Sequence, residues 1–135
     1  MNDHSALEEL RQEVGLEATL ARIVAQPELS ESLRSAVEAI LIQPEEPPRV
    51  AQAAALSGLS PMEFSRRFRE AAGVPFHEFV DRVRADAALL RISTTLAPVE
   101  AIALELGFIG VETLGLSLGE YTGLPFAAIL SLLRP

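Results

Sequence analysis

The chain has no cysteine and only two histidines, His4 and His77, among its 135 residues. The absence of cysteine excludes disulfides, thiolate nucleophiles and thiolate metal sites, and two imidazoles are too few for a convincing zinc or iron site. No apolar run approaches the roughly 20 residues of a membrane span. The first residues carry acids where a secretion signal would be basic and then apolar. We therefore expect a cytoplasmic protein with no cofactor, no metal and no membrane partner.

Lysine is absent as well, so all eleven basic residues are arginines, and they face nineteen acids. The net charge of −8 argues against a general nucleic-acid binder, because phosphate contacts require clustered cations. The charge is unevenly distributed, with −7 in residues 1–48, +2 in residues 49–93 and −3 in residues 94–135. The middle of the chain is the only basic part.

Apolar residues make up 49% of the chain, which is enough for a folded domain. Helical periodicity recurs along the sequence while strand patterns are weak, so we predict an all-α fold. Residues 1–43 are predicted to form an acidic helical arm of three helices. The first begins at Ser5 and ends at Gly15, the second is short and runs from Leu16 to before Pro27, and the third begins at Pro27. A stiff Pro-rich linker (44–48) and a main domain (49–135) follow. The acidic arm either packs on the main domain or serves dimerisation or partner docking.

The main domain contains two diverged copies of one pattern, Val50–Phe76 and Val99–Phe126. Each copy has a short helix, a glycine turn and a second helix that ends at glycine, which are the parts of a helix-turn-helix. One long helix, from about residue 76 to residue 93, is predicted to join the copies. Its expected buried residues are Phe76, Phe79, Val83, Ala87 and Leu90.

The second helices of the two copies align at a spacing of fifty residues. Their apolar positions match, since Phe64 and Phe68 correspond to Leu114 and Leu118. Their charged positions do not match. Arg66, Arg67 and Arg69 of the first copy are replaced by Leu116, Ser117 and Gly119 in the second.

This arrangement resembles the DNA-binding region of AraC/XylS-family transcription regulators, with two homeodomain-like helix-turn-helix units on a linker helix. The matching runs are LSPMEFSRRF at residues 59–68, AGV at 72–74, RVR at 82–84 and VEAIALELGF at 99–108. The resemblance covers about residues 49–133. It implies that the side chains one, four and five positions after Pro61 face a DNA groove. Here those are Met62, Ser65 and Arg66.

The first recognition helix has chemistry suited to DNA. Arg66 can bind guanine through two hydrogen bonds, and its neighbours can reach a base, a thymine methyl group or phosphates. The candidate DNA-binding residues are Met62, Ser65, Arg66, Arg67 and Arg69. The alternative is an ordinary solvated face whose arginines pair with the two glutamates of the same helix. A third possibility is that the acidic arm folds over this basic face and competes with DNA.

The second recognition helix lacks such chemistry. No side chain at its groove positions offers a hydrogen-bond donor, and Glu112 and Glu120 lie one turn on either side of Leu116, where they would meet phosphates. We predict a protein interface here, reached by the acidic arm, a second subunit or another protein. The predicted interface residues are Val111, Gly115, Leu116 and Gly119. The alternative is decay of an unused site, or a locally distorted helix.

The sequence therefore predicts a transcription regulator that contacts double-stranded DNA mainly or only through the first helix-turn-helix. The second unit would hold a protein partner or form a homodimer. The alternative is a family relative that no longer binds DNA and acts by protein contact, as a regulator partner, anti-activator or dimerisation module. An enzyme is not expected, since no nucleophile lies near a base and no glycine-rich phosphate loop is present.

Overall fold

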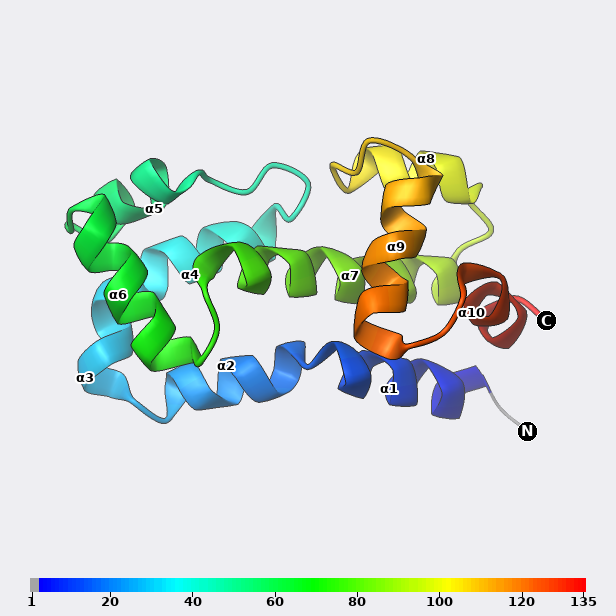
Figure 1. Ribbon diagram of the computed structural model, residues 1–135, viewed down its shortest axis with the longest axis horizontal. Helices are drawn as coiled ribbons and strands as arrows, with labels where there is room; N and C mark the ends of the chain where they lie inside the picture. Colours follow the sequence, from blue (N-terminus) through cyan, green and yellow to red (C-terminus); the bar gives the residue numbers. More distant parts are fainter. Residues whose placement is uncertain (1–2) are drawn as a thin grey trace. The chain divides into compact units, whose positions relative to one another are not determined.

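The structure is a computed structural model that describes residues 3–135, with side chains described from Ser5 onward, so that the His4 side chain lies outside the described part. Within this range the chain is helical and contains no strand, which confirms the all-α prediction (Figure 1). The helices are α1 (Asp3–Val14), α2 (Leu16–Val24), α3 (Pro27–Ser30), the 3-10 turn η1 (Glu31–Leu33), α4 (Arg34–Ile42), α5 (Val50–Leu56), α6 (Pro61–Ala72), α7 (Phe76–Thr94), α8 (Val99–Glu105), α9 (Val111–Thr122) and α10 (Phe126–Leu133).

These helices form two compact units. The first unit is Leu16–Val83 and contains the first helix-turn-helix, α5 and α6. The second unit comprises the residues up to Gly15 together with Arg84–Pro135, and contains the second helix-turn-helix, α8 and α9. The acidic arm is thus divided, with α1 in the second unit and α2 to α4 in the first. Of the alternatives for the arm, packing against the helix-turn-helix units is the one observed.

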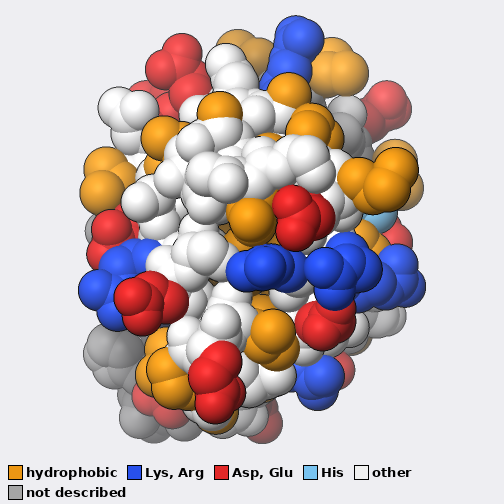
Figure 2. Space-filling view, turned by 90° about the vertical axis from the view of Figure 1, so that its left-hand side faces the viewer, with side chains coloured by type: hydrophobic (Ala, Val, Ile, Leu, Met, Phe, Trp, Pro, Cys, Tyr) orange, Lys and Arg blue, Asp and Glu red, His pale blue; other side chains and the backbone are white. Residues whose placement is uncertain are grey.

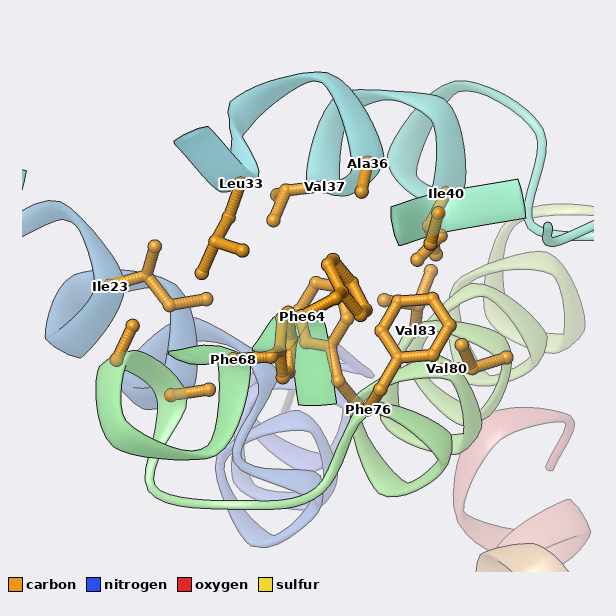
Figure 3. Packing of buried hydrophobic residues seen from close by; sticks show 14 of the residues in the cluster. Ile23, Leu33, Ala36, Val37, Ile40, Phe64, Phe68, Phe76, Val80 and Val83 are labelled. Carbon is orange, nitrogen blue, oxygen red and sulfur yellow. The ribbon is translucent and has the colours of Figure 1, made fainter. Parts of the chain in front are cut away.

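The first unit is built around a cluster of phenylalanine rings (Figure 3). Phe76 meets Phe64 and Phe68 edge-on at ring-centroid distances of 5.1 and 5.3 Å, and Phe79 lies 5.2 Å from Phe68. Such edge-to-face arrangements add to the free energy gained from burying the rings. The acidic arm closes the cluster with apolar side chains, namely Ile23, Leu33, Val37 and Ile40.

The second unit has an aliphatic core in which α1 takes part. Leu7, Leu10 and Val14 of α1 are buried in one cluster with α7, α8, α9 and α10. Arg11 on the same helix donates two hydrogen bonds to the Asp86 carboxylate, at 2.8 and 3.0 Å, and Asp86 is only 9% exposed. A fork of two parallel hydrogen bonds fixes geometry as well as charge. Helix α1 is therefore an integral part of the second unit.

We expect Arg11→Ala to lower the free energy of unfolding by about 1–3 kcal/mol, because the buried Asp86 carboxylate loses its partner. The figure is below the full cost of breaking a buried pair because the Arg11 side chain is 39% exposed and solvent screens part of the loss. Arg91→Ala is the matched control, since Arg91 is equally exposed and pairs with Glu105, itself 61% exposed. That variant should lose less than about 1 kcal/mol. Urea unfolding of both variants measures the difference, and equal losses would contradict the assignment.

Three elements differ from the sequence-based expectation. Helix α1 begins at Asp3, two residues before Ser5. The single helix expected after Pro27 is divided by the 3-10 turn Glu31–Leu33, where the bonding tightens from i→i+4 to i→i+3 for one turn. In α7 the buried stripe does not continue in phase beyond Val83. Leu90, expected to be buried, is 39% exposed, and Ala87 is only partly buried.

Candidate nucleic-acid interface

Helix α6 begins and ends as its sequence predicts. The Ser60 hydroxyl accepts a hydrogen bond from the Glu63 backbone N–H at 3.2 Å, and Pro61 occupies the first helical position. Gly73 ends the helix with φ 79°, a left-handed conformation that favours glycine. Because Phe64 and Phe68 are fully buried, the opposite side of α6 is turned to solvent. The structure thus gives α6 one face in the core and one free face.

The predicted DNA-binding residues gather on that free face. Met62 is 83% exposed and the Arg66 side chain 60% exposed, while the Arg67 side chain is 35% exposed. Ser65 and Arg69 are exposed as well. Figure 2 shows the face where α3, α5 and α6 lie, with arginine side chains in a band across its middle and acidic side chains among and around them.

Two of these arginines are paired within α6. Arg66 donates to Glu70 at 2.7 Å, and Arg67 lies 3.9 Å from Glu63, so both pairs have i,i+4 spacing. Exposed pairs of this kind are worth only about 0.3–0.5 kcal/mol, so a stronger anionic ligand such as phosphate can replace them. Arg69 has no ion-pair partner among the described residues.

The acidic arm does not cover this face. The ion pairs of Arg66 and Arg67 are made within α6, and Arg66 stays exposed although α2 and α3 pack against the same helix. In the described part of the first unit, the electrostatic cover that the sequence left as a third possibility is therefore absent.

Helix α9, fifty residues later in the sequence, has the same pattern of buried positions and the same glycine end as α6. Leu114 and Leu118 are fully buried, as are Phe64 and Phe68 at the equivalent positions. Gly123 ends the helix with φ 74°. The two recognition helices thus share one backbone plan and differ in what their free faces carry.

The free face of α9 is an apolar groove with acidic edges. The groove has a volume of about 910 Å³ and extends from α9 to the start of α10. It contains all four predicted interface residues, and its lining is Val111, Glu112, Gly115, Leu116, Gly119, Glu120, Leu124, Pro125 and Phe126. Leu116 is 76% exposed, and in the part of the second unit that is described neither Glu112 nor Glu120 has an ion-pair partner.

A family model described as a helix-turn-helix domain matches residues 53–132, which is more than half of the chain. The chain belongs to the AraC/XylS family of transcription regulators. The fold is similar to that of an AraC-type transcriptional regulator from Chromobacterium violaceum, with 19% identity, a TM-score of 0.70 and coverage of 78% of this chain and 95% of that chain. It is also similar to the DNA-binding domain of AdpA, a global transcriptional factor solved in complex with a target DNA, with 25% identity, a TM-score of 0.69 and coverage of 76% and 92%. A comparison with curated proteins finds no match.

Membership of the AraC/XylS family confirms the resemblance seen in the sequence. The family and the fold are those of transcription regulators and not of enzymes. No group of three or more potential metal ligands occurs in the described residues. Within residues 3–135 no single helix has the length and apolar character to cross a membrane. Helices α9 and α10 meet that test only when taken together, and they are bent by 83° at the break between them.

Two residues of the acidic arm hold the C-terminal end of α6, and the sequence did not predict this role for either of them. The Gln26 side-chain amide donates to the Ala71 carbonyl at 2.9 Å, which satisfies one of the unpaired carbonyls of the last turn. The Arg22 guanidinium lies over Gly73, where an added Cβ would stand 2.9 Å from Arg22 Nε. A cation at a helix C-terminus is also favoured by the helix dipole. No local motif indicates these contacts, because they join distant parts of the chain.

The two arginines of the RVR run have separate structural partners. Arg82 pairs with Glu78 at 2.7 Å and donates to the Thr19 hydroxyl at 3.2 Å, which ties α7 to α2. The Arg84 guanidinium lies 6.0 Å from the centre of the Phe108 ring, within the range of a cation–π contact. Both residues therefore stabilise the AraC/XylS-type fold, each in its own unit.

Close packing within the second unit explains why glycine stands at positions 115 and 119 of α9. A Cβ on Gly115 would stand 3.2 Å from the Phe126 Cβ, and one on Gly119 would stand 3.2 Å from the Leu124 carbonyl oxygen. Their first role is thus to let α10 and the preceding turn approach α9 closely. The groove beside them stays open.

Proposed function

We propose that this AraC/XylS-type regulator contacts double-stranded DNA mainly or only through α5 and α6, and that the α8–α9 unit makes protein contacts. The observation that supports the division is the contrast between two equivalent helix faces. At matching positions α6 presents Arg66 and Arg69 to solvent, where α9 has an exposed Leu116 and a half-buried Gly119. The solved AdpA domain binds a target DNA, and the likeness to it supports DNA as the ligand of this fold.

The chemistry of each face fits its proposed role. Arg66 has the planar fork of donors that matches the two acceptors of guanine in the major groove, and Arg67 and Arg69 are placed to hold phosphates. On α9 the carboxylates of Glu112 and Glu120 would instead be desolvated beside phosphates, without a donor to offset that cost. A single inserted recognition helix should give modest affinity.

We expect Arg66→Ala to weaken DNA binding about 5- to 150-fold, which corresponds to about 1–3 kcal/mol for one bidentate base contact. The duplex for this test is first selected from a random-sequence pool with the full chain. Fluorescence anisotropy at several salt concentrations then compares wild type, Arg66→Ala and Arg34→Ala. Arg34 is the matched control, because it is an exposed arginine of the same unit outside α6. The Arg34→Ala variant should bind the duplex with an affinity within about twofold of that of the wild type, since Arg34 is proposed to make no base contact.

The salt dependence gives a second measure. One helix-turn-helix contacts only a few phosphates. Each phosphate contact adds about −0.9 to the slope of the logarithm of the binding constant against the logarithm of the salt concentration, so the total slope should be shallow. A steep slope, or equal binding by wild type and Arg66→Ala, would contradict the proposal. Absence of any selected duplex would favour the second candidate function, a family relative that acts by protein contact alone. The ion pairs that already occupy Arg66 and Arg67, together with the net charge of −8, are the observations behind that candidate.

A further inference from the structure

We infer that the groove on α9 and α10 binds an amphipathic helix of another protein, one with arginine or lysine on both edges of its apolar face. The inference rests on the proposed function, in which the second unit contacts protein, and it specifies the chemistry of the partner. It follows from the apolar floor of the groove, the charge at its edges and the occupants that the structure disfavours.

The floor of the groove suits the side chains of a helix. Leu116 projects from α9 with 76% of its surface exposed, and Phe126 of α10 forms part of the lining. Gly115 and Gly119 line the floor beside these side chains, and neither adds a side chain of its own to the groove. Helix-in-groove recognition uses this combination of an apolar trough and a few anchoring side chains.

The edges of the groove select a basic partner. Glu112 and Glu120 both line it and are eight residues apart, which corresponds to about 12 Å along a helix axis. Neither has an ion-pair partner among the side chains that the structure describes. A helix lying along α9 would meet both carboxylates if it carried two cations about two turns apart. Such complementary charges give specificity and orientation more than affinity.

Two other occupants fit less well. The acidic arm is already placed, since α1 packs against α9 and α10 and still leaves Leu116 exposed. A second copy that used the same groove in a two-fold arrangement centred on Leu116 would bring Glu112 of one chain against Glu120 of the other. Like charges facing each other across an interface oppose association, and each chain carries −8. A basic helix from a different protein has neither problem.

The test is a selection by the full chain from a displayed library of helical peptides about 16 residues long, long enough to hold helix in isolation. Each library position on the two edges of the apolar face encodes either arginine or glutamate. We expect recovered peptides to carry arginine on both edges, at a spacing of seven or eight residues. Their affinity, measured by fluorescence anisotropy, should fall at least tenfold in Leu116→Arg and severalfold in the double variant Glu112→Gln, Glu120→Gln. Ile42→Arg is the matched control, because Ile42 is also 76% exposed but lies on α4, and it should bind as wild type.

Each possible outcome is decisive. Recovery of acidic peptides, recovery of none, or binding unaffected by Leu116→Arg would overturn the inference. Self-association in sedimentation experiments that is lost in Leu116→Arg would overturn it in favour of a second copy. DNA binding of the same variants separates this inference from the proposed function. Leu116→Arg should not lower affinity for DNA, so a protein that binds DNA through Arg66 yet selects no basic helix defeats the inference alone.

Discussion

Removal of residues 1–44 is expected to unfold the protein, and not to release its predicted DNA-binding face. The arm supplies buried side chains to both cores, with Leu10 and Val14 in the second unit and Leu33 and Ile40 in the first. Loss of one such side chain costs about 2–5 kcal/mol, while a whole domain is stable by only about 5–15 kcal/mol. Deletion of several at once therefore exceeds the stability available. The truncated protein should show little helical circular dichroism at 25 °C and no cooperative thermal transition.

A graded version of this test uses single substitutions in the arm. Leu33→Ala should lower the free energy of unfolding by about 2–5 kcal/mol, because Leu33 is fully buried. Ile42→Ala is the control, since Ile42 is 76% exposed, and it should change stability by less than about 0.5 kcal/mol. A folded truncated protein that binds DNA more tightly at low salt would show instead that the arm is a detachable electrostatic cover.

The second large effect is expected at the centre of the first unit. Phe68→Ala should lower the free energy of unfolding by about 3–5 kcal/mol, through lost burial and the cavity left behind. Phe68 is fully buried and lies within 6 Å, ring centre to ring centre, of Phe64, Phe76 and Phe79. Because these rings hold α6 in place, the recognition face should lose its fixed orientation as the core weakens. Urea unfolding measures the first effect, and hydrogen exchange along α6 measures the second.

Met62→Ala is the matched control for Phe68→Ala. Met62 lies on the same helix but is 83% exposed, so its truncation should change stability by less than about 0.5 kcal/mol. A loss below about 1 kcal/mol in Phe68→Ala would mean that the ring cluster can collapse around the missing side chain. The position of α6 would then depend mainly on its ends, where Gln26 and Arg22 make their contacts.

The helix-turn-helix units could be predicted from the sequence because their signals are local. Ser60, Pro61 and Gly73 mark the ends of α6 by cap and turn chemistry, and all three act in the structure as expected. The spacing of Phe64 and Phe68 indicates which side is buried, and both residues are fully buried. The exposure of the predicted DNA-binding face follows from the same helical geometry. Its contact with DNA stays a prediction.

The contacts of the acidic arm could not be predicted, because they join residues distant in sequence. The ion pair of Arg11 and Asp86 spans 75 residues, and the hydrogen bond from Gln26 to Ala71 spans 45. Periodicity within α7 was also insufficient. Continuing the apolar stripe of the first half of α7 beyond Val83 predicts that Leu90 is buried. The second half of the helix instead packs into a different hydrophobic cluster, where Leu89 and Ile92 are the buried residues. Hydrophobic spacing gives the face of a helix only while one core is in contact with it.

The order of the two units along the chain has a consequence for folding during synthesis. The first unit is one continuous segment, Leu16–Val83, while the second is interrupted by it. On the ribosome the first unit can therefore fold as soon as it emerges. Helix α1 is made before the first unit, but its partners in α9 and α10 are made after that unit, so its apolar residues stay exposed to solvent and to chaperones until those helices have been made. Helix α1 also carries Glu8, Glu9 and Glu13. Their negative charges would oppose aggregation of this segment while its apolar residues are exposed.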